Sequence, residues 1–219
     1  MKEWKGNSDS VRSRLGINKA HTTDGRDNDD FYATDPKALD ALLRGCSKWL
    51  GDRFDVLKKH HTPIWECACG NGNLSELMIS KGYDVISSDL KYRGYGNNPP
   101  LDFLAASANW VYRCQLFTID TIITNPPYSM ANEFILHALD ILPQGGVYIA
   151  LMNISYLCGK KRYEQIYSMN CLREIYVFSS RIECWKNNNR EEYGGKKMAD
   201  YAWYVFENGY NGQTILYWL

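Results

Sequence analysis

From residue 63 onward, short apolar runs alternate with longer amphipathic segments, and this alternation limits the fold more than any other feature. Short runs rich in β-branched and aromatic residues predict strands, and longer segments with a helical apolar period predict helices. Strands alternating with helices indicate a mostly parallel sheet with helices on both faces. The predicted strands are residues 64–69, 84–88, 118–124, 147–152 and 173–178, and the predicted helices are residues 74–81, 105–112, 129–142 and 160–168.

Two further strands are predicted close to the C-terminus. They cover residues 201–206 and 214–218, and the Asn- and Gly-rich segment 208–212 joins them. Two strands with so short a connection are typical of a hairpin. The sequence therefore predicts a seven-stranded sheet with an antiparallel pair at its C-terminal edge.

The N-terminal part of the chain lies outside this alternation. Residues 1–30 have neither a strand nor a helix period, and their six basic and six acidic residues are mixed with Asn, Ser, Thr and Gly. We expect an irregular or mobile arm there. A helix is predicted over residues 36–50, because Pro36 suits a first helical position and Thr34 or Asp35 can cap it.

Composition agrees with one globular domain over residues 31–219 and bears on its partners. The 219 residues include 25 Lys+Arg and 25 Asp+Glu, whereas a nucleic-acid-binding domain is usually basic, so any such binding must use local patches. The sequence has no run of about 18 apolar residues and no apolar signal-peptide core at its start, so we expect a cytoplasmic protein without a membrane partner. The seven cysteines lack paired C-x-x-C spacing, which indicates buried thiols and no metal site.

The first segment that indicates chemistry is the turn that follows the predicted strand 64–69. Residues 65–73 read Trp-Glu-Cys-Ala-Cys-Gly-Asn-Gly-Asn. Gly70 and Gly72 allow a tight turn and close approach of a ligand, at the carboxyl end of a strand, where open α/β sheets bind ligands. Residue 75 is not glycine, so the dinucleotide fingerprint is absent, and purely structural glycines are the alternative interpretation.

Two acidic positions follow at the ends of later segments. Asp89 ends the predicted strand 84–88 and lies 23 residues after Glu66. An acidic residue about 20 positions after such a turn accepts hydrogen bonds from ribose hydroxyls in nucleoside-binding sheets. Asp102 and Phe103 place an acid beside an aromatic ring, which can accept from an adenine amino group and cover its ring, although such an aromatic residue is also typical of a core.

The most specific motif is the tetrapeptide Asn125-Pro126-Pro127-Tyr128, which follows a predicted strand and precedes a helix. Average residue frequencies give it a chance probability on the order of 10⁻³ in a chain of this length. The two prolines fix φ and remove two backbone donors, so the Asn125 amide and the local carbonyl groups are presented rigidly. An Asn oxygen and a Pro carbonyl can accept both hydrogens of a planar amino group, while Tyr128 offers a stacking face. The tetrapeptide therefore suits an amine that must act as a nucleophile.

The order of these motifs along the chain resembles the motif series of S-adenosylmethionine-dependent amino-methyltransferases. The series is Glu66 with the glycine turn, then Asp89, then Asp102 with Phe103, and then the tetrapeptide. The resemblance is strongest to adenine-specific DNA N6-methyltransferases. It implies a Rossmann-like class I methyltransferase fold, S-adenosylmethionine as cofactor, no metal, and double-stranded DNA as the partner.

Two end segments extend the resemblance over residues 31–219. Residues 31–36, Phe-Tyr-Ala-Thr-Asp-Pro, resemble the family's motif that closes over the methionine end of the cofactor. Residues 199–210 resemble small phage-type members of the family. The chain departs from the family pattern where Cys67 follows Glu66 in place of the common proline, and no separate recognition domain follows the core.

The resemblance assigns roles to thirteen residues. It implies catalytic roles for Asn125, Pro126, Pro127 and Tyr128, with Tyr128 as the platform for a base flipped out of the duplex. It implies cofactor contacts for Phe31, Thr34, Glu66, Cys67, Gly70, Gly72, Asp89, Asp102 and Phe103.

Recognition of DNA is expected from two polar segments. Residues 181–200 form a predicted loop in which basic residues are mixed with Trp185 and Tyr193, and residues 160–162 form a second basic group. Either could contact phosphates, although a charged run is more often a solvated face. The chain could act alone, as a homodimer or with a partner subunit.

Other functions share the same tetrapeptide. Enzymes that methylate an RNA base or a glutamine amide in a protein also present a planar amino group to such acceptors. A non-catalytic module with the same fold, docked on a catalytic partner, is an alternative from another class. The segment at residues 31–36 and the C-terminal aromatic segment favour the DNA methyltransferase, whose biological setting could be restriction-modification.

Overall fold

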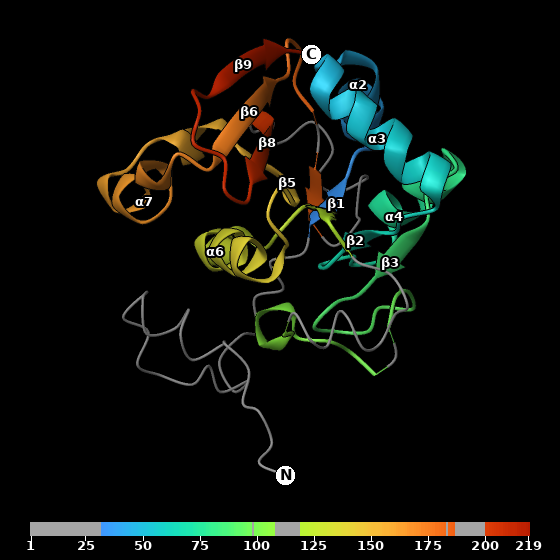
Figure 1. Cartoon of the computed structure of the whole chain (residues 1–219). Coiled ribbons are helices and arrows are strands. Elements are labelled where there is room, and N and C mark those ends of the chain that lie inside the picture. The colour runs from blue at the N-terminus through green and yellow to red at the C-terminus, as the bar shows by residue number, and fades with distance from the viewer. Residues whose placement is uncertain (1–31, 98, 108–118, 183, 187–199) are drawn as a thin grey trace.

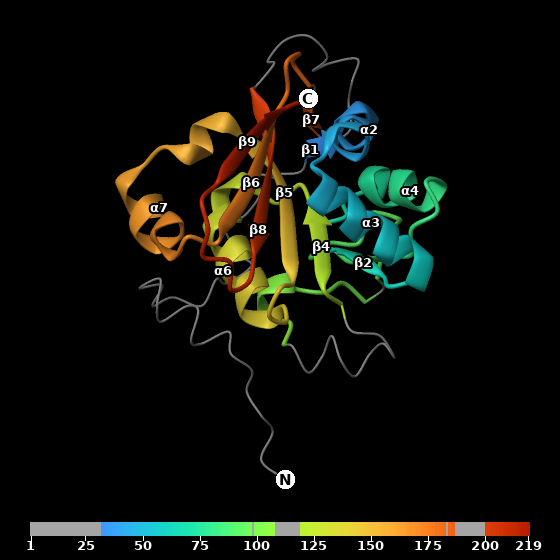
Figure 2. The same cartoon turned by 45° about the horizontal axis from the view of Figure 1, so that its top comes forward.

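The computed structural model describes residues 32–97, 99–107, 119–182, 184–186 and 200–219. A seven-stranded sheet runs through the middle of this part of the chain, and helices cover both of its faces (Figure 1, Figure 2). The predicted α/β architecture is therefore confirmed. The strands are β2 (Ile64–Glu66), β3 (Val85–Ser87), β4 (Thr121–Thr124), β5 (Val147–Asn153), β6 (Leu172–Val177), β8 (Tyr201–Glu207) and β9 (Ile215–Trp218).

The strand order in the sheet is β3-β2-β4-β5-β8-β6-β9. Strands β3, β2, β4 and β5 are parallel, so their carboxyl ends meet at one edge of the sheet. Strand β8 runs antiparallel to both of its neighbours, β5 and β6, which confirms the antiparallel element on the C-terminal side. Strand β9 is parallel to β6.

The last two strands do not pair with each other as a hairpin, because β6 lies between them. Burial explains this order. Strand β6 is buried at five of its six residues and needs a neighbour on each side, whereas β9 is mostly exposed and suits an edge. The short connection at residues 208–214 is long enough to pass one strand, so the hairpin prediction was wrong about the partner.

One face of the sheet is covered by α2 (Pro36–Gly45), α3 (Lys48–His60) and α4 (Asn73–Ser80) (Figure 2). The prediction of a single helix over residues 36–50 was wrong. The backbone is extended at Cys46, and the Ser47 side chain accepts a hydrogen bond from the Leu50 amide, which starts a new helix. The predicted cap of the first helix is confirmed, because the Asp35 side chain accepts from the Lys37 amide at 2.9 Å.

The opposite face is covered mainly by α6 (Ala131–Ile141), with α7 (Lys160–Gln165) beyond it (Figure 2). A 3₁₀ helix, η3 (Tyr128–Met130), precedes α6, so α6 begins two residues after the predicted start at residue 129. A second 3₁₀ helix, η2 (Phe103–Ala105), lies where the helix at residues 105–112 was predicted to start. Most of that prediction lies outside the described residues.

A separate two-stranded sheet joins distant parts of the chain. Strand β1 (Tyr32–Thr34) pairs antiparallel with β7 (Cys184–Lys186), with Thr34 opposite Cys184. The segment before the first helix is therefore held by the start of the predicted DNA-contacting loop. The arm at residues 1–30 and most of that loop lie outside the described residues. None of the described helices combines the length and apolar character that a membrane crossing requires.

Candidate functional site

Glu66 occupies the carboxyl end of β2 and is only 1% exposed. Its Oε1 accepts hydrogen bonds from the Thr124 hydroxyl and from the Ala68 amide. Its Oε2 has no hydrogen-bond partner among the described residues. Burial raises the pKa of the Glu66 carboxyl to about 8, against the opposing effect of these hydrogen bonds. Without a ligand, the carboxyl therefore keeps its proton at neutral pH.

The turn after β2 has the conformation that its glycines predict. Gly70 and Gly72 have φ values of 56° and 94°, in the left-handed region that favours glycine. The turn leads into α4, with Gly72 as the residue before its first turn. Between the glycines, Asn71 Oδ1 is buried without a hydrogen-bond partner among the described residues. The turn thus adds a second unpartnered buried oxygen to that of Glu66.

The group that lies close to Gly72 is the side chain of Tyr95. A Cβ placed on Gly72 would lie 2.5 Å from the Tyr95 ring. Gly94, in the loop after β3, has a similar φ of 87°, but a Cβ placed there meets nothing within 4 Å. The two glycines therefore differ in packing and share the same backbone demand.

Gly72→Ala is expected to lower the free energy of unfolding by about 3 kcal/mol, because it adds left-handed backbone strain to a clash with the Tyr95 ring. Urea unfolding followed by circular dichroism measures the loss. Gly94→Ala is the matched control and should cost only about 1 kcal/mol, the backbone part alone. Equal losses in the two variants would contradict the role assigned to the Tyr95 contact.

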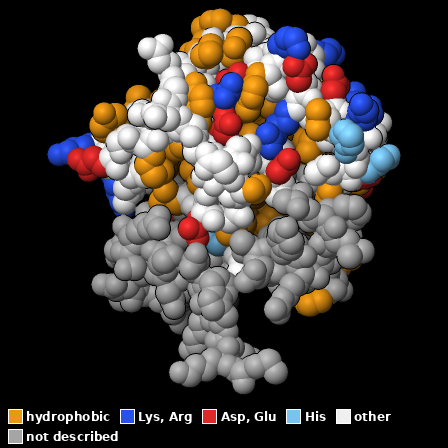
Figure 3. Space-filling model, in the orientation of Figure 1, with side chains coloured by type: hydrophobic (Ala, Val, Ile, Leu, Met, Phe, Trp, Pro, Cys, Tyr) orange, Lys and Arg blue, Asp and Glu red, His pale blue; other side chains and the backbone are white. Residues whose placement is uncertain are grey.

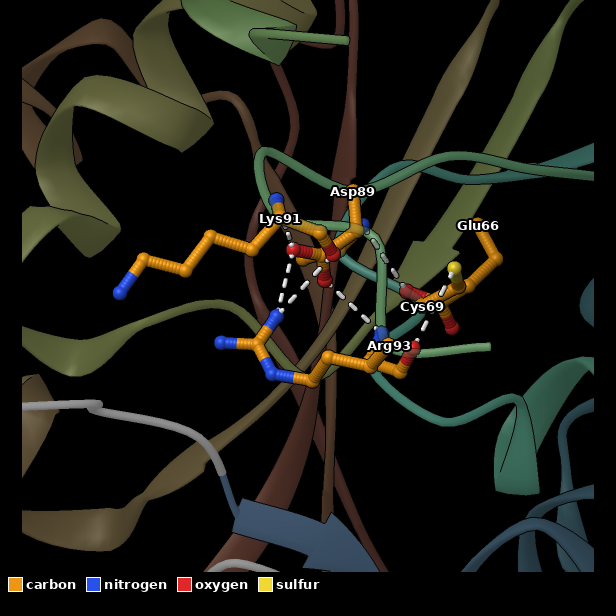
Figure 4. A network of polar contacts seen from close by, with 7 residues as sticks. Glu66, Cys69, Asp89, Lys91 and Arg93 are labelled. Atoms are coloured by element: carbon orange, nitrogen blue, oxygen red, sulfur yellow. Dashed lines mark hydrogen bonds and ion pairs between the residues drawn. The ribbon is translucent and has the colours of Figure 1, made fainter. Parts of the chain in front are cut away.

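Asp89 lies beyond the end of β3, beside the glycine turn (Figure 4). Its Oδ2 accepts a hydrogen bond from the Gly70 amide at 2.8 Å. Its Oδ1 accepts from the Lys91 amide and from Arg93 Nη1, both at 2.9 Å. The predicted ribose-binding residue and the predicted glycine turn are thus in direct contact, and a cation from the following loop shares the carboxylate.

Asp102 and Phe103 lie in different environments. Asp102 is exposed and caps η2, with its Oδ1 accepting from the Leu104 amide at 3.0 Å. Phe103 is 2% exposed, with ring centroids 5.2 Å from Trp65 and 4.8 Å from Phe134. Its packing is that of a core residue, so a role in covering adenine stays a prediction. The same applies to Cys67, which is 1% exposed and whose thiol pKa is raised by burial.

Asn125 follows β4 directly and is held between two hydroxyl groups. Its Nδ2 donates to Thr34 Oγ1 at 3.1 Å, and the Tyr128 hydroxyl donates to its Oδ1 at 3.1 Å. These two bonds hold the plane of the Asn125 amide between the Thr34 and Tyr128 side chains. Thr34 is 5% exposed, and the Tyr128 ring lies 6.2 Å from that of Tyr201. The structure therefore joins a predicted cofactor residue to the predicted catalytic tetrapeptide.

Comparison with known proteins adds the fold. No protein-family model and no curated protein matches this chain. Among solved structures, a Listeria monocytogenes protein assigned as a class I S-adenosylmethionine-dependent methyltransferase matches 97% of this chain and 73% of its own, with a TM-score of 0.53 and 12% identity. DrdV, solved in complex with DNA, matches 96% of this chain and 28% of its own, with a TM-score of 0.54 and 12% identity.

The chain has the Rossmann-like class I methyltransferase fold. In this fold the candidate site lies at the carboxyl edge of β2, β3 and β4, where open α/β sheets bind ligands. Glu66, Asp89 and Asn125 each end or follow one of these strands. Among the described residues, no group of His, Cys, Asp and Glu is arranged to hold a metal ion.

Sequence reasoning missed several neighbours of the site in this methyltransferase fold. Thr124, the hydrogen-bond partner of Glu66, directly precedes the tetrapeptide, and its position at the end of an apolar strand was the only signal. Arg93 and Tyr95 lie in a segment for which no role was predicted, yet they contact Asp89 and the glycine turn. Phe31 lies outside the described residues, so its predicted cofactor contact stays a prediction.

Proposed function

We propose that the chain is a site-specific DNA methyltransferase that transfers a methyl group from S-adenosylmethionine to the exocyclic amino nitrogen of adenine in double-stranded DNA. The observation that carries this proposal is the Asn125 amide, oriented by Thr34 and Tyr128 at the carboxyl end of β4. An oriented amide next to two prolines suits a planar amino group as the nucleophile. The class I methyltransferase fold supports the reaction type.

The residues of the site fit the proposed cofactor. Two buried oxygens that have no partner among the described residues, Glu66 Oε2 and Asn71 Oδ1, would supply acceptors for the cationic methionine end of such a molecule, Glu66 after releasing its proton. Asp89 supplies a carboxylate for the ribose. When bound, S-adenosylmethionine supplies an electrophilic methyl group. Thr34 would link the cofactor site to the tetrapeptide, because its hydroxyl accepts a hydrogen bond from the Asn125 amide.

Asn125 and Pro126 act on the target nitrogen, whose lone pair is normally delocalised into the base. Asn125 Oδ1 and the Pro126 carbonyl oxygen accept its two hydrogens, favour a pyramidal nitrogen and offset the positive charge that develops. Because Thr34 and Tyr128 already hold the amide, little reorganisation is required when the base arrives. Asn125 and Pro126 thus contribute to catalysis by orienting the target amino group and by placing partial negative charge beside it.

A base within a duplex cannot reach Asn125, so the adenine must be flipped out of the helix. Tyr128 is half-buried, and its ring is supported by the buried Tyr201, so Tyr128 would be the ring on which the flipped base stacks. Stacking on an aromatic ring is worth about 1–3 kcal/mol per base. Tyr128 would therefore offset part of the cost of removing the base from its stack.

The charge of the chain predicts that it binds DNA only modestly. Basic and acidic side chains are interspersed on the face shown in Figure 3, and the chain has a formal net charge of zero. Binding through few phosphate contacts is modest and salt-sensitive. The likeness to DrdV, solved in complex with DNA, supports a DNA substrate. A homodimer or a partner subunit would supply further contacts.

The test is transfer of labelled methyl groups from S-adenosylmethionine to three substrates offered separately: duplex DNA of mixed sequence, structured RNA, and a glutamine-bearing release factor. Label is expected in duplex DNA, and digestion to nucleosides should recover it as N6-methyladenine. Transfer to RNA or protein alone would overturn the DNA assignment. Cofactor binding without any transfer would instead favour a non-catalytic module on a catalytic partner.

A further inference from the structure

Arg93 makes an ion pair with Asp89 at the centre of the candidate cofactor site (Figure 4). Its Nη1 lies 2.9 Å from Asp89 Oδ1 and 3.3 Å from the Lys91 carbonyl oxygen. The two side chains are 22% and 13% exposed, so the pair is largely shielded from water. A charge-assisted bond in such a place is stronger than one on the open surface.

The hydrogen bonds to Asp89 differ in number between its two oxygens. A carboxylate offers about four acceptor positions, two on each oxygen. Oδ1 accepts from the Lys91 amide and from Arg93, whereas Oδ2 accepts, among the residues that the structure describes, from the Gly70 amide alone. Oδ1 is therefore fully used, and Oδ2 has room for one more donor. A ribose presents two hydroxyl groups, at its 2′ and 3′ positions.

The loop that carries Arg93 is fixed at several points. The Asn97 amide donates to the Ser87 carbonyl at 3.0 Å, and the Leu101 amide donates to the Asp89 carbonyl at 2.9 Å. Tyr95 packs against Gly72 on the other side of the loop. These contacts return the chain to β3 and to the glycine turn, so Arg93 is held near Asp89 by backbone as well as by charge.

We propose that Arg93 is a positioning residue that restricts Asp89 to a single ribose hydroxyl of the cofactor. The inference rests on the proposed function, because it takes a nucleoside-bearing cofactor as the ligand of Asp89. Arg93 itself does not touch the ribose. It sets the orientation of the carboxylate and occupies the acceptor positions that a second hydroxyl would use.

Calorimetric titration with S-adenosylhomocysteine and with its 2′-deoxy and 3′-deoxy analogues tests the proposal without any methyl transfer. For the wild-type protein, one deoxy analogue should bind within about twofold of the parent, and the other about 10-fold or more weaker, because one charge-assisted bond is lost. Arg93→Ala opens Oδ1 to a second hydroxyl, so both analogues should then bind more weakly than the parent.

Two further variants separate positioning from charge and from folding. Arg93→Lys keeps a donor for Oδ1 and should keep the one-hydroxyl pattern. This variant can be tested even if circular dichroism shows that Arg93→Ala is not folded. Lys91→Ala removes the same charge from the same loop, retains the backbone amide that bonds to Asp89, and should also keep the pattern.

The outcomes distinguish this inference from the proposed function. If the wild-type protein binds the parent ligand but loses affinity equally with both analogues, the role of Arg93 is overturned and the proposed function stands. An unchanged pattern in Arg93→Ala has the same meaning. Absence of any binding to S-adenosylhomocysteine by the wild-type protein would overturn the proposed function and this inference with it.

Discussion

Asn125→Ala is expected to lower kcat for methyl transfer by about 10²- to 10³-fold, because it removes an acceptor aimed at the charge that develops on the target nitrogen. The variant keeps Glu66, Asp89 and the glycine turn, so the dissociation constant for S-adenosylhomocysteine should change by no more than about threefold. Steady-state kinetics on duplex DNA and calorimetry with the product measure the two quantities.

Asn208→Ala is the matched control for this prediction. Asn208 Nδ2 donates to the Leu142 carbonyl at 2.8 Å, where β8 ends. Because Glu207 pairs with Val147, the first residue of β5, Asn208 lies at the opposite edge of the sheet from Asn125. Its removal costs a partly buried hydrogen bond and leaves the site intact. If kcat falls no further in Asn125→Ala than in Asn208→Ala, the catalytic role assigned to the tetrapeptide is contradicted.

Glu66→Gln is expected to raise the free energy of unfolding at pH 7 by about 3.5 kcal/mol. The pKa of Glu66 is about 8 in the folded chain because of burial, and about 4.3 is usual for an unfolded chain. Between these values the unfolded chain releases a proton that the folded chain keeps, so wild-type stability falls by about 1.4 kcal/mol per pH unit. Glutamine does not titrate, and its carbonyl oxygen can still accept from Thr124.

The difference between Glu66→Gln and wild type should therefore vanish near pH 4, grow through neutral pH and level off above about pH 8. Urea unfolding at several pH values measures it. Glu174→Gln is the control at a second buried carboxyl, whose two oxygens accept from the hydroxyls of Ser47 and Tyr176. That variant should lose stability, because an amide nitrogen cannot accept. A pH-independent difference for Glu66→Gln would contradict the raised pKa.

The sequence predicted the strands better than the connections between them. The apolar pattern placed the carboxyl end of β4 at the correct residue and that of β2 three residues too late, and these ends position Asn125 and Glu66. The break between α2 and α3 was missed, because the apolar stripe continues across it and only the Ser47 cap marks it. The apolar pattern of a segment indicates which of its faces is buried, but it does not specify which strands are neighbours in the sheet.

The details within the site were less predictable for a related reason. The bond between Thr34 and Asn125 joins residues 91 positions apart, and the ion pair of Arg93 depends on a loop without a period of its own. Phe103 reads equally well as a platform or as a core residue until its neighbours are known. Sequence can single out a residue whose type suits a given chemistry, but it does not identify the side chains that contact that residue in the fold.

The position of β8 also governs the order in which the fold can assemble. Strand β8 lies between β5 and β6 although it follows both along the chain, so β5 and β6 are never neighbours. During synthesis the half of the sheet that holds the candidate site can pair early, but β6 has no place to dock until residues 201–207 emerge. Such late, non-local pairing slows folding and leaves apolar strands exposed while the chain is being completed.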